Sequence, residues 1–385
     1  SDPIATLIPA STTRHASPMS RYASHLAHHP EPAVAVDVAA DHVEHDLGGE
    51  TATLVVAMAS DAHRAEAESL LDAVRARFPA AAVCGAIAPG GVIGVGEETD
   101  REPAVSLLAA VLPDGAAAVV EVDGADGLPD DAQLLVAFAD PYTVDVDGLA
   151  AAADATGIAL AGGLTGGRGA GDARLLATDG VRTSGAVALR LDLPGAGVHV
   201  SQGARPIAHD VVVTAAEGNV VLELAGRPAV ERLHGILASL GPDDLRLART
   251  GLMAGIVIDE NRPDWDVGDY LIRGLLGVVP ESGGLAIAAE PRVGQTLRFH
   301  VRDAAGADAD LRRVLGGAEG AGAALLFSCT GRGPHMFDGP DHDAGVVAEL
   351  LDVPVVGGFC QGELGPVAGA NHVHAFTATT VVLPR

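Results

Sequence analysis

A recurring pattern of apolar strand, amphipathic helix, apolar strand and glycine-rich turn constrains the fold of this chain more than any other feature of its sequence. The first copy begins at Thr53 with TLVVAMAS, the second at Gln133 with QLLVAFAD and the third at Ala323 with AALLFSCTG. Runs that are apolar at nearly every position indicate strands covered on both faces, and the helices between them supply that cover. We therefore predict an α/β fold of layered mixed sheets covered by helices, built from repeated strand-helix-strand-turn-strand units in two halves.

The boundary between the two halves is expected near residues 194–207, where PGAGVHVSQGARPI offers proline and glycine between a closing strand and a new hairpin. After it, HDVVVTAAEGNVVLELAG is typical of two strands joined by a tight turn, and Pro228 is well placed to begin a helix. Further strands are expected at 252–259, 270–279, 284–289 and 295–302. We accordingly assign an N-terminal region to residues 1–200 and a C-terminal region to residues 201–385.

Charge and composition exclude some classes of partner. The chain has 385 residues, of which 48% are apolar, which is enough for an extensive core. Its 24 basic residues are all arginine and face 51 acidic residues, so the formal net charge is −27. Because phosphate binding depends on clustered positive charge, nucleic acid and anionic membranes are poor partners for such a surface.

Cysteine usage and hydropathy suggest where the protein resides. The three cysteines, Cys84, Cys329 and Cys360, are far apart and form no CxxC pair, which is typical of a reducing cytoplasm. No basic segment is followed by an apolar stretch of the signal-peptide kind, and apolar runs such as 54–59 are far shorter than the roughly 20 residues that cross a bilayer. We expect a soluble cytoplasmic protein. No set of histidines or cysteines shows zinc-ligand spacing, so no metal site is expected.

The third copy carries an unusual group of polar residues directly after its first strand. In ALLFSCTGRGPHMF the apolar run ends at Cys329, and Arg332 follows between Gly331 and Gly333. His335 comes next. Residues after the carboxyl end of a central strand lie at the rim of the sheet, where α/β proteins bind ligands. The glycines permit a tight turn with exposed amides, and Arg332 can hold a carboxylate or phosphate by two hydrogen bonds. The alternative is a turn in which Arg332 pairs with a nearby acid.

A second candidate turn follows the next apolar strand. VVGGFCQGELGPVAG places Glu363 directly after Gly362, and Gly357 and Gly358 within the strand permit another backbone to approach closely. We expect Glu363 and Arg332 to meet at the same rim. Three roles are open to Glu363 there: it binds a ligand ammonium group, acts as a general base, or only holds Arg332 in place.

Three other segments hold candidate residues. NHVHAFTATTVVL alternates strictly, so His372, His374 and Phe376 should point to one face of a single strand, and His374 is a candidate ligand-binding residue. GGLTGGRGAGD at 162–172 lacks P-loop spacing, so we interpret it as a strand-to-strand turn near the rim. Cys84 is expected at a strand end in the first copy, and a buried inert thiol is its default interpretation.

These segments resemble the FIST sensory proteins, which combine an N-terminal and a C-terminal FIST region. RPIAHDVVVTAAEGNVVLELAGRPAVERL at 205–233 resembles the opening of the C-terminal region, and LLFSCTGRG with PVVGGFCQGELGPVAG resembles its closing signature. VCGAIAPGGVIGVGEE, GGLTGG and GVRTSGAVALRL are similar to patterns of the N-terminal region. The site positions carried over by the resemblance are Cys329, Arg332, Gly333, Gly358, Gly362 and Glu363.

The chain also departs from the family pattern. Gly85 and Cys360 stand where the family often has Ser or Thr and an aromatic residue, and Ala225 replaces the usual Asp. The resemblance implies a ligand-sensing role with small ligands such as amino acids, and some members resemble haem-binding nitric oxide sensors. Many relatives carry an attached signalling domain. None fits within these residues, so a separate signalling partner is expected.

Three functions are open at this point. The first is a stand-alone cytoplasmic small-molecule-binding protein in which Arg332, Glu363 and backbone amides hold the ligand. The second is a hydrolase or transferase that uses Cys329 as nucleophile, with His335 or His374 as its base. Glu363 then orients that base. The third is a gas sensor that binds haem through a histidine. A binding protein needs no complete catalytic constellation, so we favour it over an enzyme; self-association is left open.

Overall fold

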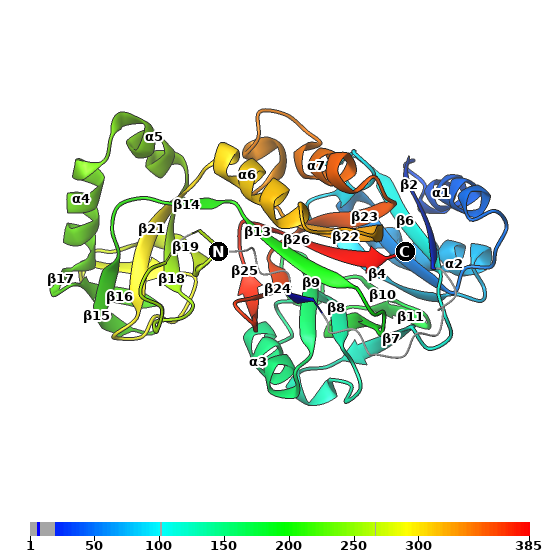
Figure 1. Cartoon of the computed structure of the whole chain (residues 1–385), viewed down its shortest axis with the longest axis horizontal. Coiled ribbons are helices and arrows are strands. Elements are labelled where there is room, and N and C mark those ends of the chain that lie inside the picture. The colour runs from blue at the N-terminus through cyan, green and yellow to red at the C-terminus, as the bar shows by residue number, and fades with distance from the viewer. Residues whose placement is uncertain (1–5, 8–19, 101, 266) are drawn as a thin grey trace. The chain divides into compact units, whose positions relative to one another are not determined.

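The computed structural model of the chain describes residues 6–7, 20–100, 102–265 and 267–385 (Figure 1). The chain divides into two compact units. The first unit contains residues 1–201, 311–373 and 377–385, and the second contains residues 202–310 and 374–376. The predicted halves, 1–200 and 201–385, are continuous in sequence, whereas the first compact unit is not, because the chain returns to it after residue 310.

Three copies of one strand-helix pattern build the first unit. The first repeat consists of β2 (Arg21–His28), α1 (Pro32–Asp46), β3 (Leu54–Ser60), α2 (Ala67–Arg77), β4 (Ala82–Ala88), β5 (Val92–Ile93) and β6 (Ala104–Val111). The second repeat consists of β7 (Ala117–Val122), β8 (Leu134–Ala139), α3 (Val146–Thr156), β9 (Ala159–Leu164), β10 (Leu175–Ala177), β11 (Gly180–Arg182) and β12 (Ala186–Leu191). The third repeat consists of β13 (Gly197–Gln202), α6 (Ala304–Leu315), β22 (Ala321–Cys329), α7 (His342–Leu351), β23 (Val355–Cys360), β24 (Glu363–Val367), β25 (Ala370–His374) and β26 (Thr377–Pro384). The second unit is therefore inserted into the third repeat, from the end of β13 into α6, whose residues 304–310 belong to the second unit.

Each repeat forms the centre of one six-stranded mixed sheet. In every sheet one pair of strands is parallel, namely β3 with β4, β8 with β9, and β22 with β23. The final long strand of each repeat, β6, β12 or β26, runs antiparallel to the first strand of that pair. The short strand β1 (Thr6–Leu7) adds to β13 at the edge of the third sheet. The α/β fold predicted from the apolar runs is confirmed.

Each repeat pairs one of its strands with the sheet of another repeat, and β11 and β25 extend two of these sheets further. Strand β5 of the first repeat pairs with β23 of the third, β10 of the second pairs with β4 of the first, and β24 of the third pairs with β9 of the second. The exchange is cyclic, so no repeat completes its own sheet. This arrangement links the three repeats into one folded body and brings their glycine-rich turns together.

One glycine in each repeat permits the close approach of the paired strands. A Cβ atom would lie 1.8 Å from the Ala57 carbonyl oxygen at Gly85, 2.0 Å from the Ala137 oxygen at Gly162, and 2.0 Å from the Leu326 oxygen at Gly357. In each case the carbonyl belongs to the residue opposite in the parallel ladder. Gly85 and Gly162 also have φ values of 149° and 130°, which other residues rarely adopt. These equivalent glycines establish the alignment of the repeats residue by residue.

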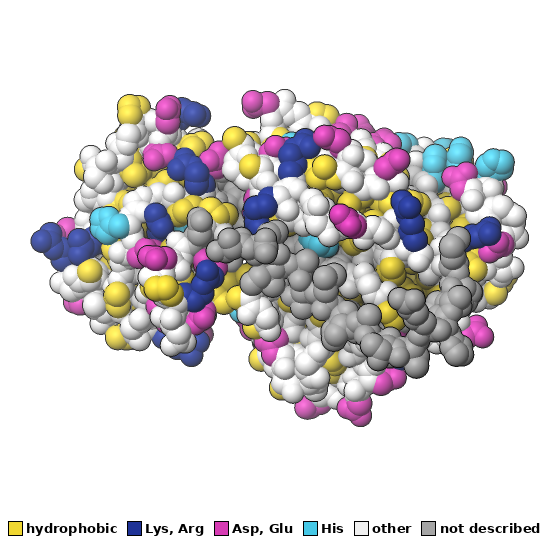
Figure 2. Space-filling view, viewed as in Figure 1, with side chains coloured by type: hydrophobic (Ala, Val, Ile, Leu, Met, Phe, Trp, Pro, Cys, Tyr) yellow, Lys and Arg dark blue, Asp and Glu magenta, His cyan; other side chains and the backbone are white. Residues whose placement is uncertain are grey.

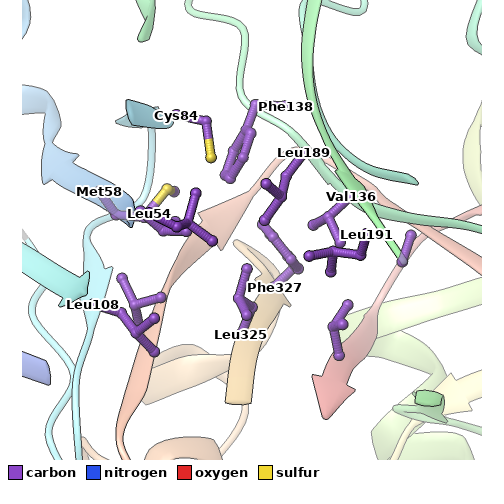
Figure 3. Close-up of a cluster of buried hydrophobic side chains, with 14 of the residues drawn as sticks. Leu54, Met58, Cys84, Leu108, Val136, Phe138, Leu189, Leu191, Leu325 and Phe327 are labelled. Carbon is purple, nitrogen blue, oxygen red and sulfur yellow. The ribbon is translucent and has the colours of Figure 1, made fainter. Parts of the chain in front are cut away.

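The main hydrophobic core lies between the three sheets. It combines side chains from all three repeats, including Met58, Phe138 and Phe327, which occupy equivalent positions one residue after the paired carbonyl (Figure 3). Phe138 and Phe327 meet edge to face, with their ring centroids 5.7 Å apart. Every residue of β3 and β8 is buried, as expected for strands that are apolar throughout.

The helices cover the outer faces of the sheets. Val36, Ala39 and Val43 of α1, together with Leu47 directly after it, are all buried, so the helix turns an apolar face to the sheet. Its outer face is solvated and carries His42, whose ring stacks on that of His25 at 3.9 Å; histidines gather near α1 in Figure 2. No helix in the described part of the chain is both long and apolar enough to cross a membrane.

The second unit is built mainly of antiparallel strands. Its elements are β14 (Ala204–Pro206), β15 (Val211–Glu217), β16 (Val220–Leu224), β17 (Arg227–Pro228), α4 (Ala229–Ser239), α5 (Pro242–Gly251), β18 (Leu252–Val257), β19 (Tyr270–Val279), β20 (Gly284–Ile287) and β21 (Thr296–Arg302). Pairing runs from β21 through β15, β16, β20, β19 and β18 and back to β21, so these strands form a closed circuit. The hairpin, the helix after Pro228 and the four later strands predicted for this region are confirmed.

Two local expectations were wrong. The segment 371–383 is not one strand, because Phe376 adopts a φ of 61° and separates β25 from β26. His372, His374 and Phe376 therefore do not share one face of a single strand. Cys84 lies in the middle of β4 rather than at its end.

Candidate functional site

A pocket of about 910 Å³ lies where strand ends of all three repeats meet. Asp61 follows β3, Gly90 follows β4, Arg168 follows β9 and Thr330 follows β22, and all four line this pocket. The loop between β5 and β6 adds residues 97–100 and Glu102. Ends of parallel strands are where α/β sheets bind ligands, because the turns there are free to vary. The segment 162–172, predicted as a turn near the rim, supplies Arg168.

Arg332 lies at the floor of this pocket in a buried ion pair. Its Nε and Nη2 atoms each donate a hydrogen bond of 2.7 Å to Asp343 of α7, and both side chains are at most 1% exposed. Ser328 donates a third hydrogen bond to the same carboxylate, also at 2.7 Å. Burial alone raises the pKa of Asp343, but the charge and hydrogen bonds of Arg332 outweigh it and hold this pKa below its usual range. Two of the Arg332 nitrogens that were predicted to hold a ligand are thus already bonded to Asp343.

The remaining nitrogen of Arg332 is not satisfied. Its Nη1 atom is buried and has no hydrogen-bond partner among the described residues. A buried guanidinium nitrogen without an acceptor costs free energy, so this atom calls for a water or ligand oxygen. Gly333, with a φ of 66°, forms the turn beside Arg332, and the exposed His335 two residues later also lines the pocket.

Glu363 lies behind the pocket rather than in its lining. Its side chain is fully buried, and Oε2 accepts hydrogen bonds from the Thr377 hydroxyl at 2.7 Å and the Thr377 amide at 3.3 Å. Burial raises the pKa of Glu363 to about 8, against the opposing effects of Thr377, Arg332 and a hydrogen bond from the Cys329 thiol. Glu363 and Arg332 therefore do not meet at the rim as expected, because Glu363 is outside the pocket lining and the guanidinium group of Arg332 pairs with Asp343.

Glu363 occupies a position that is apolar in the other two repeats. In the exchanged strands, the residues that pair one place beyond the equivalent glycines are Val92 with Gly358, Leu175 with Ala86, and Glu363 with Gly163. All three side chains are fully buried. A carboxyl group therefore stands where the fold elsewhere accepts valine and leucine.

All three cysteines are buried. Cys329 and Cys360 are opposite each other in the β22 and β23 ladder, and neither lines the pocket. Burial, followed by the charge of Glu363, raises the pKa of Cys360 well above its usual value. Burial also raises the pKa of Cys84 to about 12. Both of these thiols stay protonated at neutral pH, so they are poor nucleophiles.

The other predicted residues take supporting or separate positions. Gly358 permits close packing against β3 and β4, since a Cβ atom there would lie 2.8 Å from Ala88 and 2.9 Å from Met58. The carbonyl oxygen of Gly362 accepts the amide of Leu164 and so joins β24 to β9. His374 is buried and belongs to the second compact unit.

Sequence reasoning missed Glu98, which the structure places in the pocket. Its amide donates to Asp341 at 2.7 Å, and its Oε1 accepts the amide of Ala344 at 2.9 Å, at the N-terminus of α7. Its other carboxylate oxygen, Oε2, is buried and has no hydrogen-bond partner among the described residues. Burial, with a further contribution from Asp343, raises the pKa of Glu98 to about 7. The signal available in sequence was the acid pair after the glycines of GVIGVGEE, which alone does not identify a partner helix.

Comparison with known proteins identifies the family of this chain. Residues 53–227 match the FIST N domain and residues 229–366 match the FIST C domain. The chain is 41% identical over 374 residues to "Uncharacterized protein Rv0628c" of Mycobacterium tuberculosis (strain ATCC 25618 / H37Rv), which covers 91% of this chain and 96% of that protein. It is also 41% identical over 371 residues to "Uncharacterized protein Mb0898c" of Mycobacterium bovis, covering 91% and 95% of the two chains. The chain therefore belongs to the FIST family, whose domains are associated with sensory signal transduction.

Proposed function

We propose that this protein is a cytoplasmic sensory protein that binds a small molecule in the pocket at the strand ends and passes the signal to a separate protein. The observation that carries the proposal is the convergence of turns from all three repeats on one pocket. Its volume of about 910 Å³ is in the range of small-molecule sites, which is roughly 300 to 1,000 Å³.

The surroundings of the pocket favour ligand binding over a purely structural role. Turns of separate repeats line it, so a bound molecule contacts parts of the chain that are far apart in sequence. The Arg332–Asp343 pair gives the floor a fixed shape, because both partners are buried and joined by two hydrogen bonds. In this proposal Arg332 contributes its Nη1 atom and the backbone of its turn, and Glu363 positions the floor from behind.

A sensory role requires that binding change the protein in a way a partner can detect. The loop between β5 and β6 lies against the start of α7, where the Glu98 amide donates to Asp341, and both residues line the pocket. A ligand that contacts both segments would further restrain their relative positions. Any surface that reports on the relative positions of these two segments can serve as the output.

The proposal is tested by thermal unfolding with a panel of amines, amino acids, acyl carboxylates and haem. A ligand present at about a hundred times its Kd stabilises the native state by about 2.7 kcal/mol, which is readily measured. Ala62 lines the pocket and is exposed, so Ala62→Phe should fill part of it without disturbing the core. The matched control is Ala151→Phe on the exposed side of α3.

We expect at least one compound to raise the melting temperature of the wild type and of Ala151→Phe but not of Ala62→Phe. A compound that stabilises all three proteins equally binds elsewhere. If no compound in the panel distinguishes Ala62→Phe from its control, the pocket is not the ligand site and the proposed function is wrong.

A further inference from the structure

We propose that the pocket selects a ligand with a net positive charge, an organic amine, and that Glu98 is the residue that receives its ammonium group. This inference rests on the proposed function, since it names the ligand class of the same pocket. It differs from the sequence-based expectation, in which Glu363 was the candidate partner of an ammonium group.

The charges that line the pocket are predominantly negative. Six carboxyl groups contribute to the lining, from Asp61, Glu97, Glu98, Asp100, Glu102 and Asp341, against two arginines, Arg168 and Arg332. The charge of Arg332 is already matched by the bidentate contact with Asp343. The lining thus has a clear excess of negative charge, which attracts cations into the pocket.

Ion pairs between the lining carboxylates and neighbouring side chains do not remove this excess of negative charge. Asp61 forms an ion pair with Arg64 at 2.5 Å, and Glu97 contacts His28 at 2.7 Å. Within the ranges that the structure describes, Glu98, Glu102 and Asp341 have no ion pair, and the only lining cation without one is the exposed Arg168.

Glu98 is the most strongly positioned of these carboxylates. Its amide is held by Asp341 and its Oε1 by the amide of Ala344, so the side chain is fixed at the start of α7. Its Oε2 atom is covered and lacks a hydrogen-bond donor from any described residue. A fixed carboxylate oxygen without a donor is what an ammonium group of a ligand satisfies, since its N–H groups donate charge-assisted hydrogen bonds.

The floor of the pocket also points to an occupant. Arg332 is fully buried, and its Nη1 atom has no acceptor among the described residues. A covered acceptor on Glu98 and a covered donor on Arg332 in one pocket mark a site that is incomplete without a bound molecule or water.

The spread of the carboxylates favours an organic cation over a metal ion. Nowhere in residues 20–100, 102–265 and 267–385 do three or more His, Cys, Asp or Glu side chains come together in a group suited to a metal. The acids instead extend along a pocket of about 910 Å³. An extended amine, with N–H groups at more than one point, matches that distribution.

The test is isothermal titration calorimetry at pH 8 with three four-carbon probes that differ in charge: putrescine, a dication; γ-aminobutyrate, a zwitterion; and succinate, a dianion. We expect putrescine to bind at least about tenfold more tightly than γ-aminobutyrate, and succinate not to bind, because each charge-assisted hydrogen bond changes affinity by about this factor or more. Glu98→Gln should weaken putrescine binding by about tenfold or more, whereas Glu102→Gln, at an exposed lining position, should change it by less than about threefold.

Three results would overturn the inference. The first is tighter binding of γ-aminobutyrate or succinate than of putrescine, with loss of that binding in Ala62→Phe; the proposed function then stands and only the ligand class is wrong. The second is equal weakening by Glu98→Gln and Glu102→Gln, which removes the specific role of Glu98. The third is absence of binding by all three probes, and the thermal-unfolding panel then decides whether the proposed function fails as well. Circular dichroism of both Gln variants verifies that they fold.

Discussion

The third repeat differs from the first two at a position where all three share the same backbone pairing. Val92 and Leu175 fill this position in the first two repeats, and Glu363 fills it in the third. The fold evidently does not require a carboxyl group there, and burying one costs free energy unless it is well paired. A buried carboxyl group at this position in the third repeat therefore fits a role other than stabilising the fold.

The repeats also differ near the carboxyl ends of β3, β8 and β22, the first strands of the three parallel pairs. Asp140, directly after β8, accepts hydrogen bonds from the Tyr142 amide and the Thr143 hydroxyl, and Ser60, at the end of β3, accepts the amide of Ala104. These polar groups satisfy nearby backbone or turn atoms. In the third repeat Cys329 takes the equivalent position, and Ser328, one residue before it, donates a hydrogen bond to Asp343 of the buried ion pair. Polar groups near these strand ends thus close turns in two repeats and join the buried pair at the floor of the pocket in the third.

The largest effect is expected from breaking the buried pair of the third repeat. Asp343→Asn leaves Arg332 buried without its counter-charge, and we expect a loss of about 3–5 kcal/mol in the free energy of unfolding. Urea unfolding measures it. The control is Asp72→Asn, which removes an exposed partner of Arg75 and should cost less than about 1 kcal/mol. An equal effect of the two substitutions would contradict the difference between a buried and a surface pair.

The double variant Arg332→Met with Asp343→Leu separates stability from function. Replacing both charges by apolar groups should recover most of the lost stability, because a buried pair is often no more stabilising than a well-packed apolar pair. Ligand binding should not recover, since the floor then lacks the guanidinium group. Recovery of binding together with stability would show that the pair serves packing alone.

The next largest loss of stability is expected from alanine at the three equivalent glycines, and it tests whether the repeats are structurally equivalent. Ala at Gly85, Gly162 or Gly357 places a methyl group about 2 Å from a carbonyl oxygen, so we expect each single substitution to destabilise the protein by about 2–4 kcal/mol. Gly345→Ala in α7 is the control, because its Cβ atom would have open space and alanine favours helices by about 1 kcal/mol. Markedly unequal costs among the three glycines, measured by urea unfolding, would count against their structural equivalence.

A smaller and pH-dependent effect is expected from Glu363→Gln. Because the pKa of Glu363 is raised to about 8 from an ordinary value of 4.5, the folded protein keeps a proton that the unfolded chain releases. Its contribution to stability is therefore favourable at low pH and is lost as the pH rises from 4.5 towards 8. Relative to the wild type, Glu363→Gln should remove this decline, which amounts to about 1.4 kcal/mol for each unit by which the pKa is raised. Glu102→Gln, at an exposed position, should leave the decline unchanged when unfolding is compared at pH 5 and pH 8.

Sequence patterns predicted the repeats because their physical cause is local. A run such as TLVVAMAS is buried on both faces, and its composition alone indicates that. The same reasoning placed Arg332 and His335 at the end of a strand and identified 162–172 as a rim turn. It also predicted the barrel-like strands of the second unit, whose alternation and turn residues are short-range signals.

The remaining features depend on contacts that leave no local signal. Strands β5 and β10 have two and three residues, too few for a periodic pattern, so their exchange between repeats could not be inferred. Asp343 is eleven residues from Arg332 on a different element, and nothing in the spacing identifies it as the partner. Glu98 reaches the start of α7 from 246 residues away. Only the fold brings these groups together.

The most direct test of the account is hydrogen–deuterium exchange with the tightest-binding compound of the thermal-unfolding panel. If turns of three repeats share one ligand site, the compound should slow exchange in three separate segments, 89–100, 165–168 and 330–341. It should leave the helix end at Gly157 and the turn at Gly48 and Gly49 unchanged, since these lie outside the lining. Protection confined to the turn of a single repeat, or located outside all three segments, would contradict the claim that the repeats build one site.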